Sequence, residues 1–381
     1  MVVRVTWKRA LTTAALLLAL GMTIAWTGII NIGASTGHWA ITDWFLHWAM
    51  RNTARTYAAL TVDEPAADPR GLVSAAGHYA GSCAVCHGAP GQPPSPVMQA
   101  STPHAPDLSV TAGTYTNAEL FWIIKHGIKF TPMPAWPTLE RDDEVRRMVA
   151  FVRLLPEMTP AEYLELAFGP VGTIAGAHPI GFEDALDECE RCHAEDGRRQ
   201  PDIPVLAGQK PVYLLEALDE FATGRRDSGV MAAAAARVDP DLRRELAEHY
   251  AGLEGLTDRP ERVAAGSASE ENDTERPLEA DEAIEPVDVE GLAEAAEVVA
   301  NGLPAIDLPA CSKCHAPGKR PDYPRLAGQK MEYMTARLRR WRADEDAVEA
   351  RQPDEPMPVI ARRIPERLIE PLARYFAGEE P

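Results

Sequence analysis

A long apolar run lies near the N-terminus. It extends from Ala10 to about Ala34 without a charged residue, and three basic residues precede it. A bilayer core needs roughly 20 apolar residues in a helix, whereas the apolar part of a secretory signal has roughly 7–15. The run therefore predicts a transmembrane helix, with its basic flank in the cytoplasm and the rest of the chain outside. Cleavage after Ala34, among small residues, is the alternative.

A tryptophan-rich segment follows, from His38 to Leu60. Trp39, Trp44 and Trp48 are four to five residues apart, so apolar and polar side chains separate onto different faces of a helix. This spacing predicts an amphipathic helix at the outer membrane surface, with its indoles at the depth of the headgroups. A helix that docks on a membrane partner is the alternative.

Beyond residue 70 the apolar residues recur at helical spacing, and the alternating pattern of strands is absent. The chain is therefore predicted to be all-α. Asp142 and Asp239 are suited to cap helices, and Pro365 suits a first helical turn. Helices are predicted over Val73–Gly81, Asp142–Leu154, Tyr213–Phe221, Asp241–Leu253, Leu292–Asn301, Tyr333–Trp341 and Pro365–Phe376.

Changes in composition divide the chain into segments. Residues 1–60 hold the predicted anchor and interfacial helix. Compact units are expected over residues 70–158, 180–256 and 289–381. Residues 257–288 are acidic, rich in serine and proline, and without an aromatic residue. Low hydrophobicity with like charge predicts disorder, so this segment is expected to be a flexible linker.

The second and third units contain an internal repeat. One copy reads CERCH…PDIPVLAGQKPVYLLEAL from Cys189, and the other reads CSKCH…PDYPRLAGQKMEYMTARL from Cys311. The offset is 122 residues at the cysteine pairs and 120 at Leu206 and Leu326. A two-residue difference in one loop accounts for the change, so the two units are interpreted as a duplication.

The formal net charge is −19. Such a surface repels nucleic acid, and no basic patch with interleaved aromatic residues opposes that interpretation. The charge suits docking against a positively charged face of a protein, although acidity can also serve solubility alone. The chain has six cysteines, and all of them fall into three Cys-x-x-Cys pairs.

Each cysteine pair is followed directly by a histidine. Two thiols three residues apart on a helical turn can each add to a vinyl group of one porphyrin, and the next residue then directs its imidazole at the iron. A zinc site and a secreted disulfide framework are the alternatives, but the pairs lie far apart and each has the trailing histidine. We therefore predict three covalently bound haem c groups. The predicted attachment residues and first axial ligands are Cys83, Cys86 and His87; Cys189, Cys192 and His193; and Cys311, Cys314 and His315.

Methionine is the predicted second axial ligand of each iron, because His/Met ligation closes both axial positions and suits electron transfer. Met133 and Met357 each lie between two prolines, which hold a loop extended and stiff. Met231 is the only methionine between Met158 and Met331. The predicted ligands are therefore Met133, Met231 and Met357.

Other residues compete for these positions. Some of the methionines fall on predicted helices, where packing in a core is the expected role. The histidines would give bis-histidine ligation. The competitors are Met98, Met148, Met331, Met334, His78, His104, His126 and His249.

The repeated units resemble the two halves of the cytochrome c4 family, tandem class I domains that shuttle electrons to terminal oxidases. The matching residues are the cysteine motifs, Pro204-Val-Leu-Ala-Gly-Gln209, Pro324-Arg-Leu-Ala-Gly-Gln329, and the last helices with Tyr250 and Tyr375. The first unit resembles a separate class I single-haem domain through Ala105-Pro-Asp-Leu108 and Met133-Pro-Ala-Trp136. The resemblance implies three small class I cytochrome c-like helical domains.

The resemblance also implies a partner for each ligand histidine. In class I cytochromes a proline carbonyl accepts a hydrogen bond from the imidazole, which fixes its tautomer and orientation. By position these residues are Pro106, Pro204 and Pro324. The chain departs from the family in two ways. Its linker is much longer than in a compact two-haem cytochrome, which leaves the packing of the second and third units open, and the second unit has little predicted helix before Cys189.

Together these features predict an electron-transfer protein and not an enzyme. It is expected in a bacterial inner membrane with its haem domains in the periplasm. Its partners would be redox proteins: a quinol-oxidising complex, a dehydrogenase or a terminal oxidase. A haem subunit that accepts electrons within a membrane dehydrogenase complex is the first alternative. A haem enzyme such as a peroxidase, with one open iron, is the second.

Overall fold

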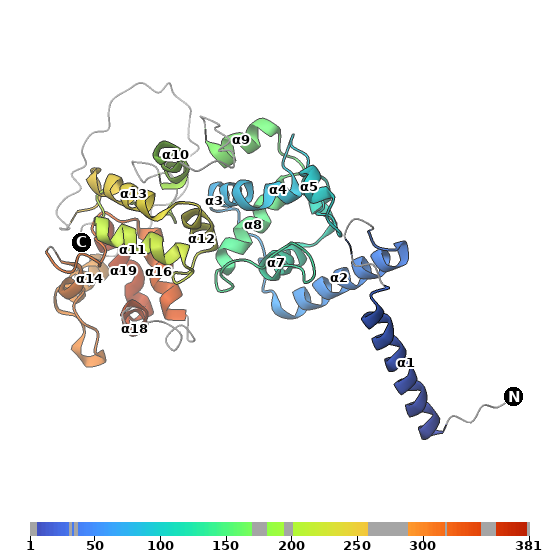
Figure 1. Ribbon diagram of the computed structural model, residues 1–381. Coiled ribbons are helices and arrows are strands. Elements are labelled where there is room, and N and C mark those ends of the chain that lie inside the picture. Colours follow the sequence, from blue (N-terminus) through green and yellow to red (C-terminus); the bar gives the residue numbers. More distant parts are fainter. Residues whose placement is uncertain are drawn as a thin grey trace, which may run out of the picture.

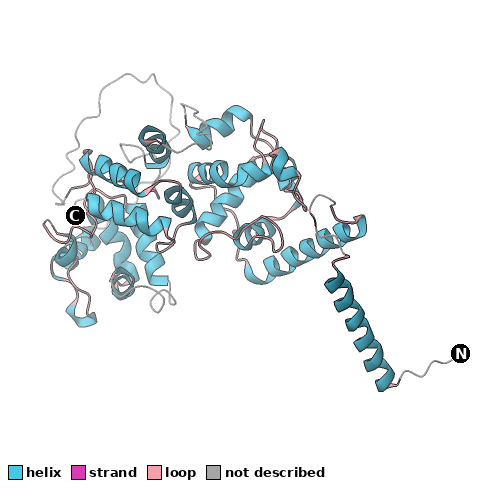
Figure 2. Cartoon of the chain, in the orientation of Figure 1, coloured by secondary structure: helices cyan, strands magenta, loops and turns pink. Residues whose placement is uncertain are grey.

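The computed structural model describes residues 6–29, 33, 37–169, 181–193, 201–257, 289–316, 318–343 and 356–378. Within these ranges every regular element is a helix, and β-pairing is confined to isolated bridges (Figure 2). The all-α prediction is confirmed. Apart from Thr257, the predicted acidic linker lies outside the described residues.

Two long helices come first along the chain (Figure 1). α1 spans Trp7–Thr27, buries no residue and projects away from the rest of the molecule. By length and composition it is the one helix among the described residues that could cross a membrane. It ends at Gly28, so the predicted run to Ala34 is longer than the helix, and Ala34 itself lies outside the described residues.

α2 spans Ala40–Thr61 and packs along the first unit. Ala54 and Ala58 are buried, and the ring of Tyr57 stacks on Trp122 of α7 with 5.5 Å between centroids. The aromatic side chains of its first turns are left exposed, because the packed residues all lie in its second half. α2 is therefore attached to the first unit along one face and at one end only.

The first unit is built on a core of aromatic and aliphatic side chains. The ring of Tyr79 packs on Phe151 and Tyr163, with centroids 5.3 and 6.4 Å apart. Because Tyr163 belongs to α9, this core continues beyond the predicted end of the unit at Met158. The helices are α3 (Leu72–His78), the π-helix η2 (Tyr79–Cys83), α4 (Ala84–His87), α5 (Pro96–Gln99), α6 (Leu108–Thr111), the 3-10 turn η3 (Ala112–Thr114), α7 (Asn117–His126), α8 (Asp142–Leu154) and α9 (Pro160–Phe168).

The second unit has four helices in its described residues. Ala185 of α10 packs with Val238, Leu242 and Leu246 around α13. α10 already begins at Phe182, so the expectation of little helix before Cys189 was wrong; its acidic first turn suits a helix N-terminus. The helices are α10 (Phe182–His193), α11 (Pro211–Ala222), α12 (Gly229–Ala236) and α13 (Pro240–Gly252).

The third unit packs its first helix against its last. Val298 and Leu372 belong to the same buried cluster, as do Leu368 and Ile369. The described helices are α14 (Val289–Asn301), the 3-10 turn η4 (Pro304–Ile306), α15 (Ser312–His315), α16 (Met331–Ala343), α18 (Met357–Arg363) and α19 (Glu366–Ala377).

The helix ends in the structure agree only in part with the caps predicted from the sequence. Asp239 caps α13 as predicted, because its carboxylate accepts hydrogen bonds from the backbone of Asp241 and Leu242. Asp142 was predicted to cap α8 but is its first helical residue; Arg141 takes the cap position, and the Asp142 carboxylate pairs with Lys125 instead. Pro365 precedes α19 as its N-cap and is not in its first turn.

Units two and three are joined by a pair of equivalent glutamines. Gln209 Oε1 accepts from Arg325 N at 2.8 Å, and its Nε2 donates to Arg325 O at 3.1 Å. Gln329 makes the same pair of bonds to Val205, at 2.9 and 3.2 Å. Both glutamines are buried. The repeated Leu-Ala-Gly-Gln motif therefore builds a reciprocal contact between the two copies.

Candidate haem sites

The first cysteine motif lies where η2 passes into α4. Cys83 ends η2, and Cys86 and His87 lie on the single turn of α4. Nδ1 of His87 is 2.9 Å from the carbonyl oxygen of Pro106. The buried Tyr79 hydroxyl donates to Gly88 O at 2.7 Å and holds the chain directly after the histidine.

The other two motifs repeat this geometry. His193 ends α10, and its Nδ1 is 3.1 Å from Pro204 O. His315 ends α15, and its Nδ1 is 2.9 Å from Pro324 O. The structure therefore brings together each of the three histidines and the proline predicted to orient it. In each ring Nδ1 is engaged, which leaves Nε2 for a metal.

Burial sets the charge of these histidines. It lowers the pKa of His87 and His315 and lowers the pKa of His193 to about 4. The hydrogen bond to the proline carbonyl opposes the shift in each case. The imidazoles are consequently neutral at pH 7, which is the state that binds iron.

The six cysteines are free and half-buried beside these histidines. Burial raises the pKa of Cys83 and Cys189 to about 12 and that of Cys311 to about 11. The thiols of Cys83, Cys189 and Cys311 are therefore protonated at pH 7 and are not poised as thiolate nucleophiles. Paired thiols next to a neutral histidine with a free Nε2 fit a covalently attached haem. Among the described residues no three His, Cys, Asp or Glu side chains gather into a group that could hold a metal ion.

Met133 lies on a loop that backbone contacts hold in place. Its carbonyl accepts from Ile128 N at 3.2 Å, and Trp136 N donates to Lys125 O at 2.9 Å. Gly127 turns with a φ of +63°, and a Cβ there would lie 2.5 Å from the backbone of Pro134. Only glycine fits this turn, so the loop can lie close against the end of α7.

The other two predicted methionine ligands lie at helix starts. Met231 is in the first turn of α12, where its N–H donates to the Oγ of the N-cap Ser228 at 3.1 Å. Met357 is the first residue of α18. All three methionines are half-buried. Their role as ligands stays a prediction.

The competing residues have other surroundings. Met148 and Met334 are buried in cores, as expected of helix-packing residues. His104 and His126 are exposed. His78 is buried and its ring packs on Trp136 with 4.6 Å between centroids. His249 lies between the rings of Phe182 and Tyr250, Met98 is half-buried on α5, and Met331 begins α16.

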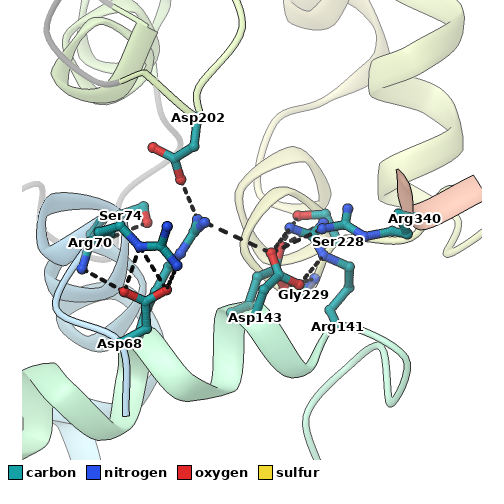
Figure 3. A network of polar contacts seen from close by, with 12 residues as sticks. Asp68, Arg70, Ser74, Arg141, Asp143, Asp202, Ser228, Gly229 and Arg340 are labelled. Carbon is teal, nitrogen blue, oxygen red and sulfur yellow. Dashed lines mark hydrogen bonds and ion pairs between the residues drawn. The ribbon is translucent and has the colours of Figure 1, made fainter. Parts of the chain in front are cut away.

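Sequence reasoning missed a polar network where the three units meet, which we call the three-unit junction (Figure 3). Asp143 of α8 binds Arg340 of the third unit at 3.0 Å. The next turn places Arg147 against Asp202 of the second unit. Burial opposes ionisation of Asp143, yet hydrogen bonds and charges from Arg141, Arg340 and Arg147 hold its pKa well below its usual range. The remaining members are Glu144, Asp227, Ser228 and Gly229.

The sequence carries only a weak signal for this junction. Three acidic residues open α8, and a favourable interaction with the helix dipole explains them equally well. Their partners are distant in sequence, so no local pattern could reveal the pairing.

Comparison with known proteins defines the class. Residues 72–152 match a family model described as cytochrome c oxidase, cbb3-type, subunit III. This match covers α3 to α8 of the first unit, with its cysteine motif and Met133. The chain is a c-type cytochrome, and the homologues described next indicate covalently bound haem c and a role in electron transfer.

Two groups of relatives match a little over half of the chain. A thiosulfate dehydrogenase electron acceptor from Stutzerimonas stutzeri is 29% identical over 54% of this chain and 83% of its own length. One from Thiomonas intermedia is 26% identical over 56% of this chain and 90% of its own length. A cytochrome c4 from Azotobacter vinelandii is 27% identical over 50% of this chain and 83% of its own length.

Two solved structures also align with part of the chain. A cytochrome c4 from Acidithiobacillus ferrooxidans aligns with a TM-score of 0.38 and 21% identity, over 50% of this chain and 98% of its own. A cytochrome c4 from Pseudomonas stutzeri aligns with the same TM-score and 18% identity, over 53% of this chain and 99% of its own.

Proposed function

We propose that the protein is a tri-haem electron carrier that faces the periplasm from the inner membrane. One observation carries this proposal: three Cys-x-x-Cys-His motifs lie in three helical units, and each histidine is bound through Nδ1 to a proline carbonyl. In this proposal residues 70–158, 180–256 and 289–381 each carry one haem.

Bound haem supplies reversible one-electron chemistry. The chain's own residues would hold and orient it. The paired cysteines attach the porphyrin, and His87, His193 and His315 each offer a neutral Nε2 in an orientation set by the proline. Met133, Met231 and Met357 would close the opposite positions, which keeps small molecules from the iron and favours electron transfer over oxygen chemistry.

The methionine assignment predicts that the native reduced protein does not bind carbon monoxide quickly. Met133→Ala, Met231→Ala and Met357→Ala should each open one iron to carbon monoxide and lower the potential of that haem, because the thioether raises it. Met148→Leu and Met334→Leu alter buried core residues and are matched controls. Rapid binding by the native protein would instead indicate an open iron and favour a haem enzyme.

The number of haems has a direct test. Mass spectrometry of the denatured protein should show three covalently attached haems, and Cys-to-Ser substitution at both cysteines of one motif should remove one. Two haems in the native chain would contradict the proposal.

The membrane attachment is supported by α1 and α2. α1 is long and apolar enough to span a bilayer, and it buries no residue against the described protein. The exposed aromatic end of α2 follows it in the chain, with Trp39 83% and Trp44 60% exposed. In this proposal α1 crosses the membrane and α2 lies at its periplasmic surface.

A membrane-binding test distinguishes the contribution of α1 from that of α2. The full chain should stay in membranes after a high-salt wash, because apolar insertion is insensitive to salt. A chain beginning at Gly37 should lose that resistance and bind vesicles only through α2. Adding Trp44→Ser and Trp48→Ser should weaken this binding further. Full-length protein in the soluble periplasmic fraction would contradict the anchor, whereas soluble protein that lacks α1 would argue for a cleaved signal.

Two kinds of partner are supported. The family model of the first unit is that of an oxidase subunit, which favours electron flow towards a terminal oxidase. The matches to thiosulfate dehydrogenase electron acceptors favour a second role, as the electron-accepting haem subunit of a dehydrogenase. Two assays of the purified protein would distinguish these roles. Reduction by a quinol-oxidising complex, followed by oxidation in membranes that contain an oxidase, would support the first role. Reduction by a dehydrogenase with which the protein forms a complex would support the second.

A further inference from the structure

Glu144 is the most enclosed charged side chain of the three-unit junction. It lies in the first turn of α8, in the first unit, and only 4% of its side chain is exposed. A carboxylate out of water needs partners for both of its oxygens. The structure supplies donors from two units.

Four donors surround this carboxylate. Oε1 accepts from Ser228 Oγ at 2.6 Å and lies 2.8 Å from Nη1 of Arg141. Oε2 accepts from Gly229 N at 2.7 Å and from Trp136 Nε1 at 3.1 Å. Because every neighbour donates, an ionised carboxylate satisfies all four, whereas an amide would turn its own N–H groups towards two donors.

The partners of Glu144 belong to the two segments that carry predicted methionine ligands. Ser228 is the N-cap of α12, and its Oγ accepts from the N–H of Met231. Trp136 is three residues beyond Met133 on the same loop. Gly229 lies so close to this indole that a Cβ would overlap Trp136 Nε1. One carboxylate therefore fixes the start of α12 against the methionine loop of the first unit.

The first unit also contacts the second haem motif itself. Arg191 lies between Cys189 and Cys192, and its guanidinium donates to Ala167 O at the end of α9. The same guanidinium covers Gly77 of α3, where a Cβ would collide with it. The first unit thus contacts both the helix that bears His193 and the helix that bears Met231.

We propose that Glu144 is a positioning residue for the second haem. In this proposal Glu144 of α8 holds the start of α12, which bears Met231, and the contact of α3 and α9 with Arg191 holds α10, which bears His193. The first unit would thus keep both axial-ligand helices of that haem in place. This inference rests on the proposed assignment of Met231 as a ligand. It makes the second haem site a product of more than one unit.

The experiment uses the full holoprotein and reads each ferric haem separately. The methyl signals of iron-bound methionine in paramagnetic NMR, the far-red band of methionine-ligated ferric haem, and the affinity for added imidazole are measured together. Met231→Ala identifies the signals of the second haem. Glu144→Ala and Glu144→Gln remove the charge. Gly229→Ala pushes the start of α12 away from Trp136, because the added Cβ would overlap the indole. Asp142→Asn, on the same helix turn, is the control, because its carboxylate pairs with Lys125 inside the first unit.

Glu144→Ala and Gly229→Ala should weaken the methionine signal of the second haem and raise its affinity for imidazole about tenfold or more, since hydrogen bonds to a buried charge are lost. Signals of the third haem should not move, and Asp142→Asn should match the native protein. A residue that only supports stability would leave the ligand signals of folded protein unchanged.

Unchanged second-haem signals in Glu144→Ala, with Met231→Ala removing those signals, would overturn the inference and leave the ligand assignment standing. If Met231→Ala removes no methionine signal, the ligand assignment fails and the inference fails with it. Glu144→Gln keeps the shape of the side chain and provides folded protein should the alanine variant not accumulate.

Discussion

At the scale of single residues, a buried histidine makes the stability of this protein depend on pH. This residue, His78, lies under Trp136 with no partner for its Nδ1. Burial lowers its pKa from 6.5 to about 4, and the charge of Glu144 opposes the shift. His78 is therefore neutral in the folded protein at pH values where an unfolded chain carries the charge.

This difference predicts a pH dependence of stability. Between pH 6.5 and about 4 unfolding takes up a proton at His78, so the free energy of unfolding falls as pH falls, by at most about 1.4 kcal/mol per pH unit. His78→Phe keeps an aromatic ring on Trp136 and should flatten the dependence in urea titrations. His104→Gln, at an exposed histidine of the same unit, should not. Equal slopes in all three proteins would contradict the assignment.

Site residues divide into those that a motif reveals and those that only the fold brings together. The cysteines and histidines form a recognisable motif, because attachment of one porphyrin would demand a fixed local spacing. The proline partners followed from a family resemblance, and the structure places all three against their histidines. Glu144 was not predictable, because its partners at Ser228 and Gly229 are more than 80 residues away in sequence.

At the scale of elements, the sequence pattern located half of the α-helices in the described residues, and α7 and α9 are among those it missed. α8 and α13 were predicted within a residue, since each presents a continuous apolar face to its core. α10 was missed because its turns before Cys189 are mostly acidic, and only Ala185 is buried there. α12 was missed because a run of alanines has no apolar face to detect.

Helix capping gives a prediction at this scale. Asp239→Ala removes the acceptor for two backbone N–H groups of α13 and should lower the free energy of unfolding by about 1 kcal/mol. Asp241→Ala is the matched control, because that carboxylate is 87% exposed and pairs only with Arg244. Chemical denaturation measures both. A loss as large in the control would show that surface charge and not capping is responsible.

At the scale of the whole molecule, the three units are joined by specific polar contacts. The sequence left the relation of units two and three open, because their connection is long. The structure joins them through Gln209 and Gln329, whose equivalence follows from the repeat. The repeat was visible in the sequence, but the contact between its copies was not, since each glutamine binds the backbone of the other unit.

Loss of the two glutamine contacts should allow units two and three to move apart. Gln209→Ala removes two hydrogen bonds to the part-buried backbone of Arg325, at a cost of about 1–3 kcal/mol, and Gln329→Ala does the same at Val205. The double variant should give a larger radius of gyration in small-angle X-ray scattering. Gln92→Ala, at an exposed glutamine of the first unit, should give the native value. A native radius in the double variant would show that other contacts suffice.

The glutamine contact has a consequence for how tightly the copies must bind. Units two and three belong to one chain, so each meets the other at an effective concentration of roughly millimolar order, set by the tether and not by the amount of protein. An interface with a bimolecular dissociation constant of that order would already be half closed. Weak mutual affinity is therefore enough to keep the copies together.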